Sequence, residues 1–163
     1  MAKAFIIGRF QPVHLGHVYA IKEAMKKFDE VVIGIGSSNE SSTFRNPFSF
    51  DEREQMLRLV GIKCKVVGIP DIKDDKEWCE QIFKTVDFDV AITGSEWVKK
   101  CFYGRKKVGK PDFLLPEVYS GVRIREKMSK GEKWEDLVPK KVADFIKKIG
   151  GEERIKESAE REF

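Results

Sequence analysis

Short apolar runs that alternate with helical patterns mark the first part of this chain. Four of these runs are rich in β-branched and other apolar residues at consecutive positions, which is typical of strands covered on both faces. They span residues 4–7, 31–35, 65–69 and 90–93. Strands that alternate with helices form right-handed units with parallel strands. The sequence therefore predicts an α/β fold with a doubly wound parallel sheet, which binds ligands beyond the carboxyl ends of its strands.

Apolar spacing and capping residues predict the helices between these strands. Ser49, followed by Glu52 three positions later, forms a capping box ahead of a helix over residues 50–60. A third helix ends near Val86. In the first helix, one apolar stripe at steps of three or four residues consists of Val18, Ile21, Met25 and Phe28.

From residue 120 onward the pattern is entirely helical, with helices predicted over 120–128, 139–149 and 152–163 and a turn near Trp134. Ile155, Ala159 and Phe163 lie on one stripe of the last helix, which predicts that it docks on the body or on a neighbouring subunit. A chain of 163 residues fits one domain. We expect a single domain over 1–163, with a parallel α/β core over about 1–115 and a helical C-terminal part over about 116–163.

Charge and cysteine content narrow the functional classes. The chain has 31 Lys and Arg against 27 Asp and Glu, and the two signs are interleaved. A nucleic-acid binder usually concentrates its positive charge, so we expect a small phosphate-bearing ligand and no nucleic acid. Cys64, Cys79 and Cys101 are widely spaced, which predicts thiols in a reducing cytosol. Only a short apolar run follows the N-terminus, so we expect a cytoplasmic protein without membrane association.

The segment G-R-F-Q-P-V-H-L-G-H leaves the first predicted strand and enters the first predicted helix. It holds the only two histidines, His14 and His17, which at this spacing point the same way, toward N–H groups that attract phosphate. Gly8 and Gly16 permit close approach of a ligand. The alternatives are histidines of the core or surface and a two-histidine metal site. No Cys or Glu stands nearby at ligand spacing, so we expect no metal held by the protein.

The motif H-x-G-H after a first strand resembles the signature of the nucleotidyltransferase superfamily. The longer string is similar to that of the nicotinamide-mononucleotide adenylyltransferases of archaea and their bacterial relatives, and the resemblance runs from Ala4 to about Ile155. It implies synthesis of NAD and pyrophosphate from ATP and nicotinamide mononucleotide, by in-line attack of the acceptor phosphate on the α-phosphate of ATP. It also implies Mg²⁺, held chiefly by the triphosphate, and a homo-oligomer.

Two further segments match this family and supply implied phosphate contacts. The family's arginine before N-P-F falls on Arg45, and the arginine of S-G-T-x-x-R falls on Arg125. Ser120 is predicted to cap a helix whose first amides Gly121 exposes. The resemblance implies His14, His17 and Arg125 as catalytic residues. The implied ATP- and phosphate-binding residues are Gly8, Arg9, Phe10, Gln11, Gly16, Arg45, Ser120 and Gly121.

Each of these arginines could instead lie on the surface. The alternative for Arg45 is a solvated loop residue, and the alternative for Arg125 is a surface residue of its helix. Arg123 is expected on the surface. We expect Arg53 to pair with acidic neighbours on the surface of its helix. The basic runs 99–100 and 105–107 are expected to be solvated surface.

The family's tryptophan that stacks on nicotinamide falls on Trp78, for which core packing is the alternative. Asp75 stands where the family has asparagine, and a carboxylate accepts from the amide NH₂ but cannot donate to its C=O. The implied acceptor-binding residues are Asp75, Trp78, Gly36 and Ser37.

Three positions depart from the family pattern and keep two alternatives open. Asp75, and Ser95 in place of an asparagine, favour a transferase with a different phosphorylated acceptor. Val122 replaces a threonine and cannot donate a hydroxyl bond, which favours a nucleotide-sensing module without catalysis. The histidine pair and Arg125 favour an enzyme, because binding alone has no need of groups that act in the transition state.

Overall fold

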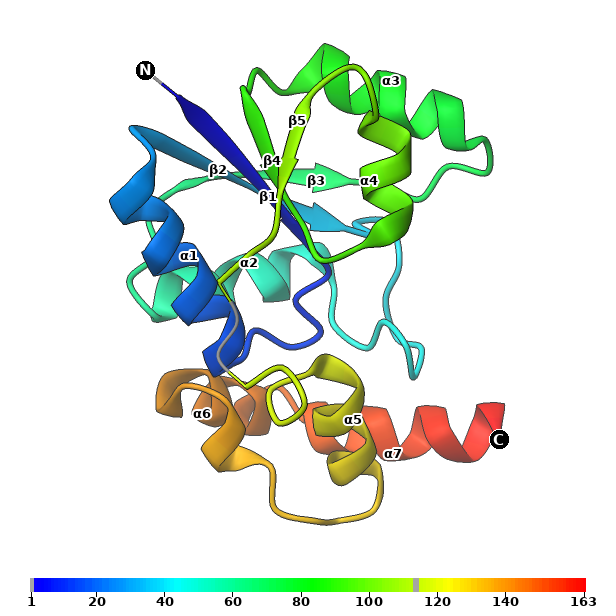
Figure 1. Cartoon of the computed structure of the whole chain (residues 1–163). Coiled ribbons are helices and arrows are strands. Elements are labelled where there is room, and N and C mark those ends of the chain that lie inside the picture. The colour runs from blue at the N-terminus through cyan, green and yellow to red at the C-terminus, as the bar shows by residue number, and fades with distance from the viewer. Residues whose placement is uncertain (1, 113–114) are drawn as a thin grey trace.

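A five-stranded parallel sheet forms the centre of the computed structural model, which describes residues 2–112 and 115–163 (Figure 1). Its strands are β1 (Lys3–Gly8), β2 (Glu30–Gly36), β3 (Lys65–Ile69), β4 (Val90–Ile92) and β5 (Lys107–Gly109). They lie in the order β3-β2-β1-β4-β5 and all neighbours pair in parallel. The predicted doubly wound sheet and its four predicted strands are confirmed. The sequence did not predict β5, because three residues that begin with a lysine carry too short a pattern.

Helices cover both faces of this sheet (Figure 1). On one face lie α1 (Leu15–Lys27) and α2 (Phe50–Leu59), and on the other lie α3 (Asp75–Thr85) and α4 (Glu96–Phe102), of which α4 was not predicted. Successive side chains of a strand point to opposite faces. Ala4 and Ile6 of β1 accordingly join the core on the α1 side, whereas Phe5 joins the core on the α3 side.

The predicted helical C-terminal part is confirmed and lies below the sheet in the view of Figure 1. It consists of α5 (Gly121–Ser129), a 3₁₀ turn (Glu135–Leu137), α6 (Lys140–Lys148) and α7 (Gly151–Glu162). Ile124, Ile146 and Ile155 bring these helices into the core cluster of the α1 face. Within the described ranges, no helix is long and apolar enough to cross a membrane.

Two predicted apolar stripes need correction at single positions. Met25 is 48% exposed, and Ala24 instead faces the core from α1. Phe163 is 84% exposed, whereas Ser158 of α7 is buried. The inner face of α7 therefore includes a polar residue, and α7 packs on α5 and α6 of its own chain.

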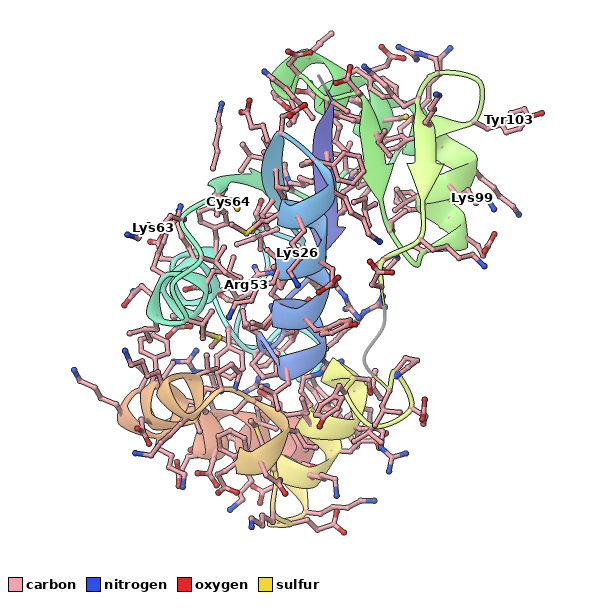
Figure 2. All side chains as sticks on the ribbon, turned by 60° about the vertical axis from the view of Figure 1, so that its left-hand side comes forward. Lys26, Arg53, Lys63, Cys64, Lys99 and Tyr103 are labelled. Carbon is pink, nitrogen blue, oxygen red and sulfur yellow. The ribbon has the colours of Figure 1, made fainter. Side chains whose placement is uncertain are left out.

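The basic run Arg105–Lys107 is also more than the solvated surface that was expected. Lys106 Nζ donates to the carbonyl of Phe88, and Lys107 begins β5. The guanidinium of Arg105 lies 4.2 Å from the centroid of the Phe83 ring. Lys99, by contrast, is exposed as expected, and Figure 2 shows it pointing away from the body of the molecule.

Arg53 overturns the prediction of a surface ion pair, because its side chain is fully buried. Its Nη1 donates to Arg9 O (2.9 Å) and Gly36 O (2.7 Å), and its Nη2 donates to Ser37 O (3.0 Å). Burial, and then the charge of Arg9, lower the pKa of Arg53 to about 10, so it is still a cation at neutral pH. Arg53 therefore ties α2 to the segments that leave β1 and β2. These segments form the site described next.

Candidate active site

Two adjoining hollows lie beyond the carboxyl ends of the strands, where the fold class predicts ligand binding. The first hollow, of about 330 Å³, is lined mainly by the segment that leaves β1, by α1 and by the start of α5. The second hollow, of about 490 Å³, is lined by the ends of β1 and β2 and by residues of α3 and α4. Both volumes suit a small ligand. The hollows share Ile7, Gly8, Thr93 and Gly94 along their boundary.

His14 and His17 line the first hollow and together cap the N-terminus of α1. The backbone N–H of His17 donates to His14 Nδ1 (3.3 Å), and the backbone N–H of His14 donates to His17 Nδ1 (3.1 Å). The rings are stacked with centroids 3.6 Å apart. A nitrogen that accepts a hydrogen bond carries no proton, so a neutral imidazole in this geometry holds its proton on Nε2. The cap therefore fixes the tautomer of both rings.

Both histidines are neutral at neutral pH. Burial lowers the pKa of His14 to about 4. Burial, and then the charge of His14, hold the pKa of His17 well below its usual range. Each ring consequently offers Nε2–H as a hydrogen-bond donor without the repulsion that two stacked imidazolium ions would suffer.

The low pKa of His14 predicts a pH-dependent stability. Since the folded-state pKa lies below that of the unfolded chain, the unfolded state binds more protons, and stability is lost as the pH falls from about 6.5 toward 4. His14→Asn keeps an acceptor at the δ position but does not titrate. Between pH 7.5 and 5, wild type should lose about 2 kcal/mol more unfolding free energy than this variant, measured in urea. If the unfolding free energies of wild type and His14→Asn fell equally with pH, the lowered pKa of His14 would be contradicted.

Gly16, Phe10 and Gly8 shape the surroundings of the two rings. A Cβ on Gly16 would lie 2.9 Å from Cε1 of His14, so this glycine makes room for the imidazole. The ring of Phe10, a residue only 2% exposed, lies 4.5 Å from that of His17. A Cβ on Gly8 would lie 3.2 Å from the Phe10 ring. All three line the first hollow, and they hold the histidines in place.

The side chain of Gln11 is not positioned to bind phosphate as predicted, because both of its polar atoms form hydrogen bonds with backbone groups. It is 2% exposed, and its amide exchanges two hydrogen bonds with Phe48: Nε2 donates to the carbonyl (3.0 Å) and Oε1 accepts from the N–H (2.9 Å). The carbonyl of Gln11 accepts from Arg125 Nη1 (2.7 Å). Gln11 therefore fastens the histidine segment to the 42–48 segment.

Three arginines converge on the site. Arg9 and Arg45 line the second hollow, and Arg9 Nη1 is buried with no partner among residues 2–112 and 115–163. Burial, and then Arg45, lower the pKa of Arg9, while Asp71 opposes them. Burial, and then Arg9 and Arg45, lower the pKa of Arg125 to about 10. Guanidinium groups that disfavour one another's charge create a site that favours an anion.

Arg125 lies behind the hollows and is not among the described residues that line either of them. It is 4% exposed, and its buried Nε has no partner in the described part of the chain. A Cβ on Gly121 would lie 2.7 Å from Arg125 Nη1, so the glycine leaves room for the guanidinium. Ser120 is confirmed as the cap of α5, since its Oγ accepts from Arg123 N (3.2 Å). Ser120 and Gly121 line the first hollow.

The second hollow contains three of the four predicted acceptor-binding residues, namely Gly36, Ser37 and Trp78. Trp78 is 6% exposed, and the ring of Trp97 lies 4.6 Å from it. Asp75 is absent from the described lining of this hollow; its Oδ2 accepts from Trp97 Nε1 (3.1 Å). The structure thus gives Asp75 a contact that holds Trp97 and does not bring it into the second hollow.

This placement predicts the behaviour of an Asp75→Asn variant. An asparagine oxygen can still accept from the indole N–H, so Trp97 stays in place. For the acceptor that the family resemblance implies, nicotinamide mononucleotide, and its carboxylate analogue, nicotinic acid mononucleotide, the ratio of the two kcat/KM values should therefore change less than about twofold. A polar contact with the acceptor would shift it several-fold. Steady-state rates with both acceptors decide between these outcomes. Trp97→Ala serves as the comparison, because it should lower kcat/KM for both acceptors.

Sequence reasoning missed several lining residues. Asp71 lines the second hollow and accepts a hydrogen bond from Ser37 Oγ (3.0 Å), and Tyr119 lines the first. Asp71 stands two residues after β3, so its position at a strand end was a signal that could have found it. Tyr119 carries no such signal. The boundary between the two hollows also includes Thr93, which directly follows β4.

Ser95 explains one departure from the expected motif. Its Oγ accepts from Val98 N (3.3 Å) and caps α4. Serine and asparagine are both good N-caps, so the replacement keeps the helix start. Across the described ranges, no three His, Cys, Asp or Glu side chains converge as ligands for a metal ion.

Comparison with known proteins gives a consistent picture. Residues 5–146 match a family model described as cytidylyltransferase-like. The chain is 40% identical to the nicotinamide-nucleotide adenylyltransferase of Pyrococcus furiosus, covering 100% of this chain and 95% of that protein. It is 39% identical to the protein of the same name from Archaeoglobus fulgidus, covering 99% of each.

A solved structure shares the fold. It is a bifunctional NMN adenylyltransferase/ADP ribose pyrophosphatase from Francisella tularensis, complexed with AMP and a manganese ion, and it superposes with a TM-score of 0.80 at 22% identity. The match covers 97% of this chain and 52% of that one. The similarity therefore concerns about half of the bifunctional protein.

Proposed function

This chain belongs to the cytidylyltransferase-like family, and we propose that it is an adenylyltransferase that makes NAD and pyrophosphate from ATP and nicotinamide mononucleotide. One observation carries the proposal. Two neutral imidazoles that carry their protons on Nε2 line the first hollow, which shares a boundary with the second hollow and its cations, Arg9 and Arg45. Donors and cations placed in advance around one point suit a reaction between two phosphates.

We assign ATP to the first hollow and the mononucleotide to the second. The first hollow begins at the N-terminus of α1 and reaches that of α5, which are both favourable places for phosphate groups. The second hollow offers the rings of Trp78 and Trp97 to a flat heterocycle, with Arg9 and Arg45 for its phosphate. The two phosphates then meet at the shared Gly8 and Gly94.

The reaction needs no nucleophile from the protein. An oxygen of the acceptor phosphate attacks the α-phosphorus of ATP, a new P–O bond forms, and the bond to pyrophosphate breaks with the electron pair leaving on that group. Binding both substrates in one orientation supplies a large part of the rate. Nε2–H of His14 and His17 donates to phosphate oxygens as charge redistributes in the transition state, and the arginines balance the remaining charge.

We propose that Mg²⁺ enters as part of the ATP substrate. The donor set of the site supports this, because among the described lining residues the carboxylate is Asp71 of the second hollow, which already accepts a hydrogen bond from Ser37 and interacts with the charge of Arg9. Mg²⁺ is commonly bound through substrate phosphates and one or two carboxylates. When bound, it neutralises charge on the phosphates.

We further propose that the protein works in the cytoplasm as a homo-oligomer. The free thiols of Cys64, Cys79 and Cys101 suit a reducing compartment. Tyr103, which is 87% exposed and points outward in Figure 2, offers apolar surface that a second copy can cover. Sedimentation velocity at several concentrations checks the assembly.

The experiment that tests the function is incubation of the purified protein with Mg·ATP and one acceptor at a time. NAD and pyrophosphate should appear in equal amounts with nicotinamide mononucleotide. Nicotinic acid mononucleotide and phosphorylated acceptors without a pyridine ring serve as comparisons. Turnover of one of the latter in preference to nicotinamide mononucleotide would replace this proposal by the alternative acceptor class. ATP binding, measured by calorimetry, without turnover of any acceptor would indicate a sensing module.

A further inference from the structure

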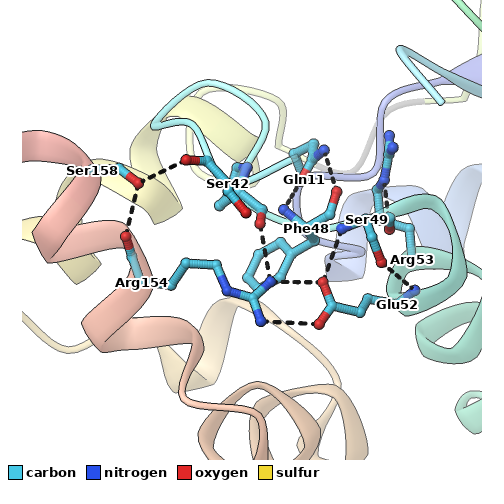
Figure 3. A network of polar contacts seen from close by, with 9 residues as sticks. Gln11, Ser42, Phe48, Ser49, Glu52, Arg53, Arg154 and Ser158 are labelled. Atoms are coloured by element: carbon cyan, nitrogen blue, oxygen red, sulfur yellow. Dashed lines mark hydrogen bonds and ion pairs between the residues drawn. The ribbon is translucent and has the colours of Figure 1, made fainter. Parts of the chain in front are cut away.

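The C-terminal helix α7 lies along the segment that carries Arg45 (Figure 3). Ser42 O accepts hydrogen bonds from Arg161 Nη2 (2.8 Å) and from Ser158 Oγ (3.4 Å). The backbone N–H of Phe44 donates to Glu162 Oε2 (2.9 Å). Contacts separated by more than 100 residues in sequence thus tie the last turns of α7 to the backbone that precedes Arg45.

Arg154 makes the corresponding connection on the other side of Arg45. Its Nη1 donates to Pro47 O (3.0 Å), and its two nitrogens form a fork with both oxygens of Glu52 at 2.7 and 3.0 Å (Figure 3). Glu52 also accepts from Ser49 N and so closes the capping box of α2. The side chains of the pair are only 27% and 19% exposed. A bidentate, partly buried pair is both stronger and better defined in geometry than an exposed one.

The protonation state of Glu52 suits an ion pair with Arg154. Burial alone would raise the pKa of Glu52, but the hydrogen bonds from Arg154 and Ser49 outweigh it and lower the pKa below the usual value. Glu52 is therefore ionised at neutral pH. Arg154 therefore joins α7 to the start of α2 through Glu52, and it joins α7 to the 42–48 segment directly through the carbonyl of Pro47.

Between these two attachments, Arg45 occupies a tight turn. Thr43 N donates to Asn46 O (3.3 Å), and Asn46 N donates to Thr43 Oγ1 (2.9 Å). Gln11 holds Phe48, three residues after Arg45, to the histidine segment. Arg45 itself is exposed, and its side chain lines the second hollow. Its position therefore depends on what holds the backbone around it.

We propose that α7 is a positioning element for the reaction, in which Arg154, together with Arg161 and Glu162, fixes the 42–48 segment so that Arg45 faces the acceptor phosphate. The role assigned to the phosphate rests on the proposed function. A free segment must be ordered each time a substrate binds, and this ordering costs conformational entropy. A segment that is already held by α7 avoids this cost, and its cation stands where the phosphate arrives.

Trypsin gives a direct readout of the segment that does not depend on activity. Arg45 is the only Lys or Arg between residues 37 and 52, so cleavage after Arg45 reports local opening of this segment. Arg154→Ala should accelerate this cleavage by about tenfold or more. The double variant Arg161→Ala/Glu162→Ala changes exposed residues at the helix end and should do so without unfolding the protein. Glu157→Ala, an exposed position of α7, is the matched control and should cleave as wild type does.

A double-mutant cycle with Arg45 tests whether the effect reaches the site. If α7 acts through Arg45, Arg154→Ala and Arg45→Ala should each raise KM for the acceptor about tenfold or more, and the combined variant should be little worse than Arg45→Ala. Additive losses, or a lower thermal midpoint with unchanged cleavage after Arg45, would overturn the proposal and leave α7 a stabilising helix. Should the wild type make no NAD, the cleavage experiment still decides whether α7 holds the segment, so the two failures are distinguishable.

Discussion

Replacing His17 by asparagine is expected to lower kcat by about 100-fold or more while leaving the fold intact. The amide oxygen of asparagine takes the position of Nδ1, so it can still accept from the backbone N–H of His14 and complete the cap of α1. What the variant loses is Nε2–H, the donor that we assign to the reacting phosphates in the first hollow. Because this donor is assigned to the transition state, binding of ATP should change much less than turnover.

Two further variants separate the parts played by the imidazole. His17→Gln carries its amide about where Nε2 lies but loses the acceptor at the δ position, so it should retain more turnover than His17→Asn and less thermal stability. His17→Ala should lose both. Rates are measured in single turnovers, with the thermal midpoint of each variant recorded beside them. Equal single-turnover rates for wild type and His17→Asn would show that the histidine pair serves only as a helix cap, and the proposed chemistry would then fail.

Features encoded within a few consecutive residues could be predicted from the sequence. The capping box of Ser49 and Glu52 forms as predicted, because both partners lie on one turn of backbone. Ser120 caps α5 for the same reason. The strands followed from runs of apolar residues, and the histidine pair followed from its spacing after β1. In each case the local pattern and the global fold agree.

The destinations of long polar side chains could not be predicted in this way. Arg53 reaches carbonyls at the ends of two strands, 16 and 44 residues away, and Gln11 reaches a backbone 37 residues away. Neither contact leaves a periodic trace in the sequence. Asp75 was aligned to a substrate contact, yet its neighbour is Trp97 of α4, a helix of seven residues whose apolar pattern is too short to identify it from the sequence. These side chains serve the site by holding its backbone, and only the tertiary structure identifies them.

Arg125 provides the second large expected effect, and the structure changes the reason for it. The resemblance implies contact with the ATP phosphates, whereas the guanidinium lies behind the hollows and holds the carbonyl of Gln11 at 2.7 Å. Lysine keeps the charge but is a single point donor without the planar fork. Arg125→Lys should therefore lower kcat/KM for ATP by about tenfold, and Arg125→Met, which removes the cation, should lower it by about 100-fold.

Arg123 offers the matched control, because it is exposed and stands two residues earlier on the same helix. Arg123→Ala should leave kcat/KM for ATP within about twofold of wild type. Comparison of the effects on kcat and on KM then distinguishes a direct phosphate contact of Arg125 from a structural role in holding the backbone of Gln11. Displacement of the segment that carries His14 would lower kcat, since the transition-state donors move, whereas loss of a simple phosphate contact in the bound complex would raise KM. Equal damage from Arg123→Ala and Arg125→Lys would mean that neither reading of Arg125 is right.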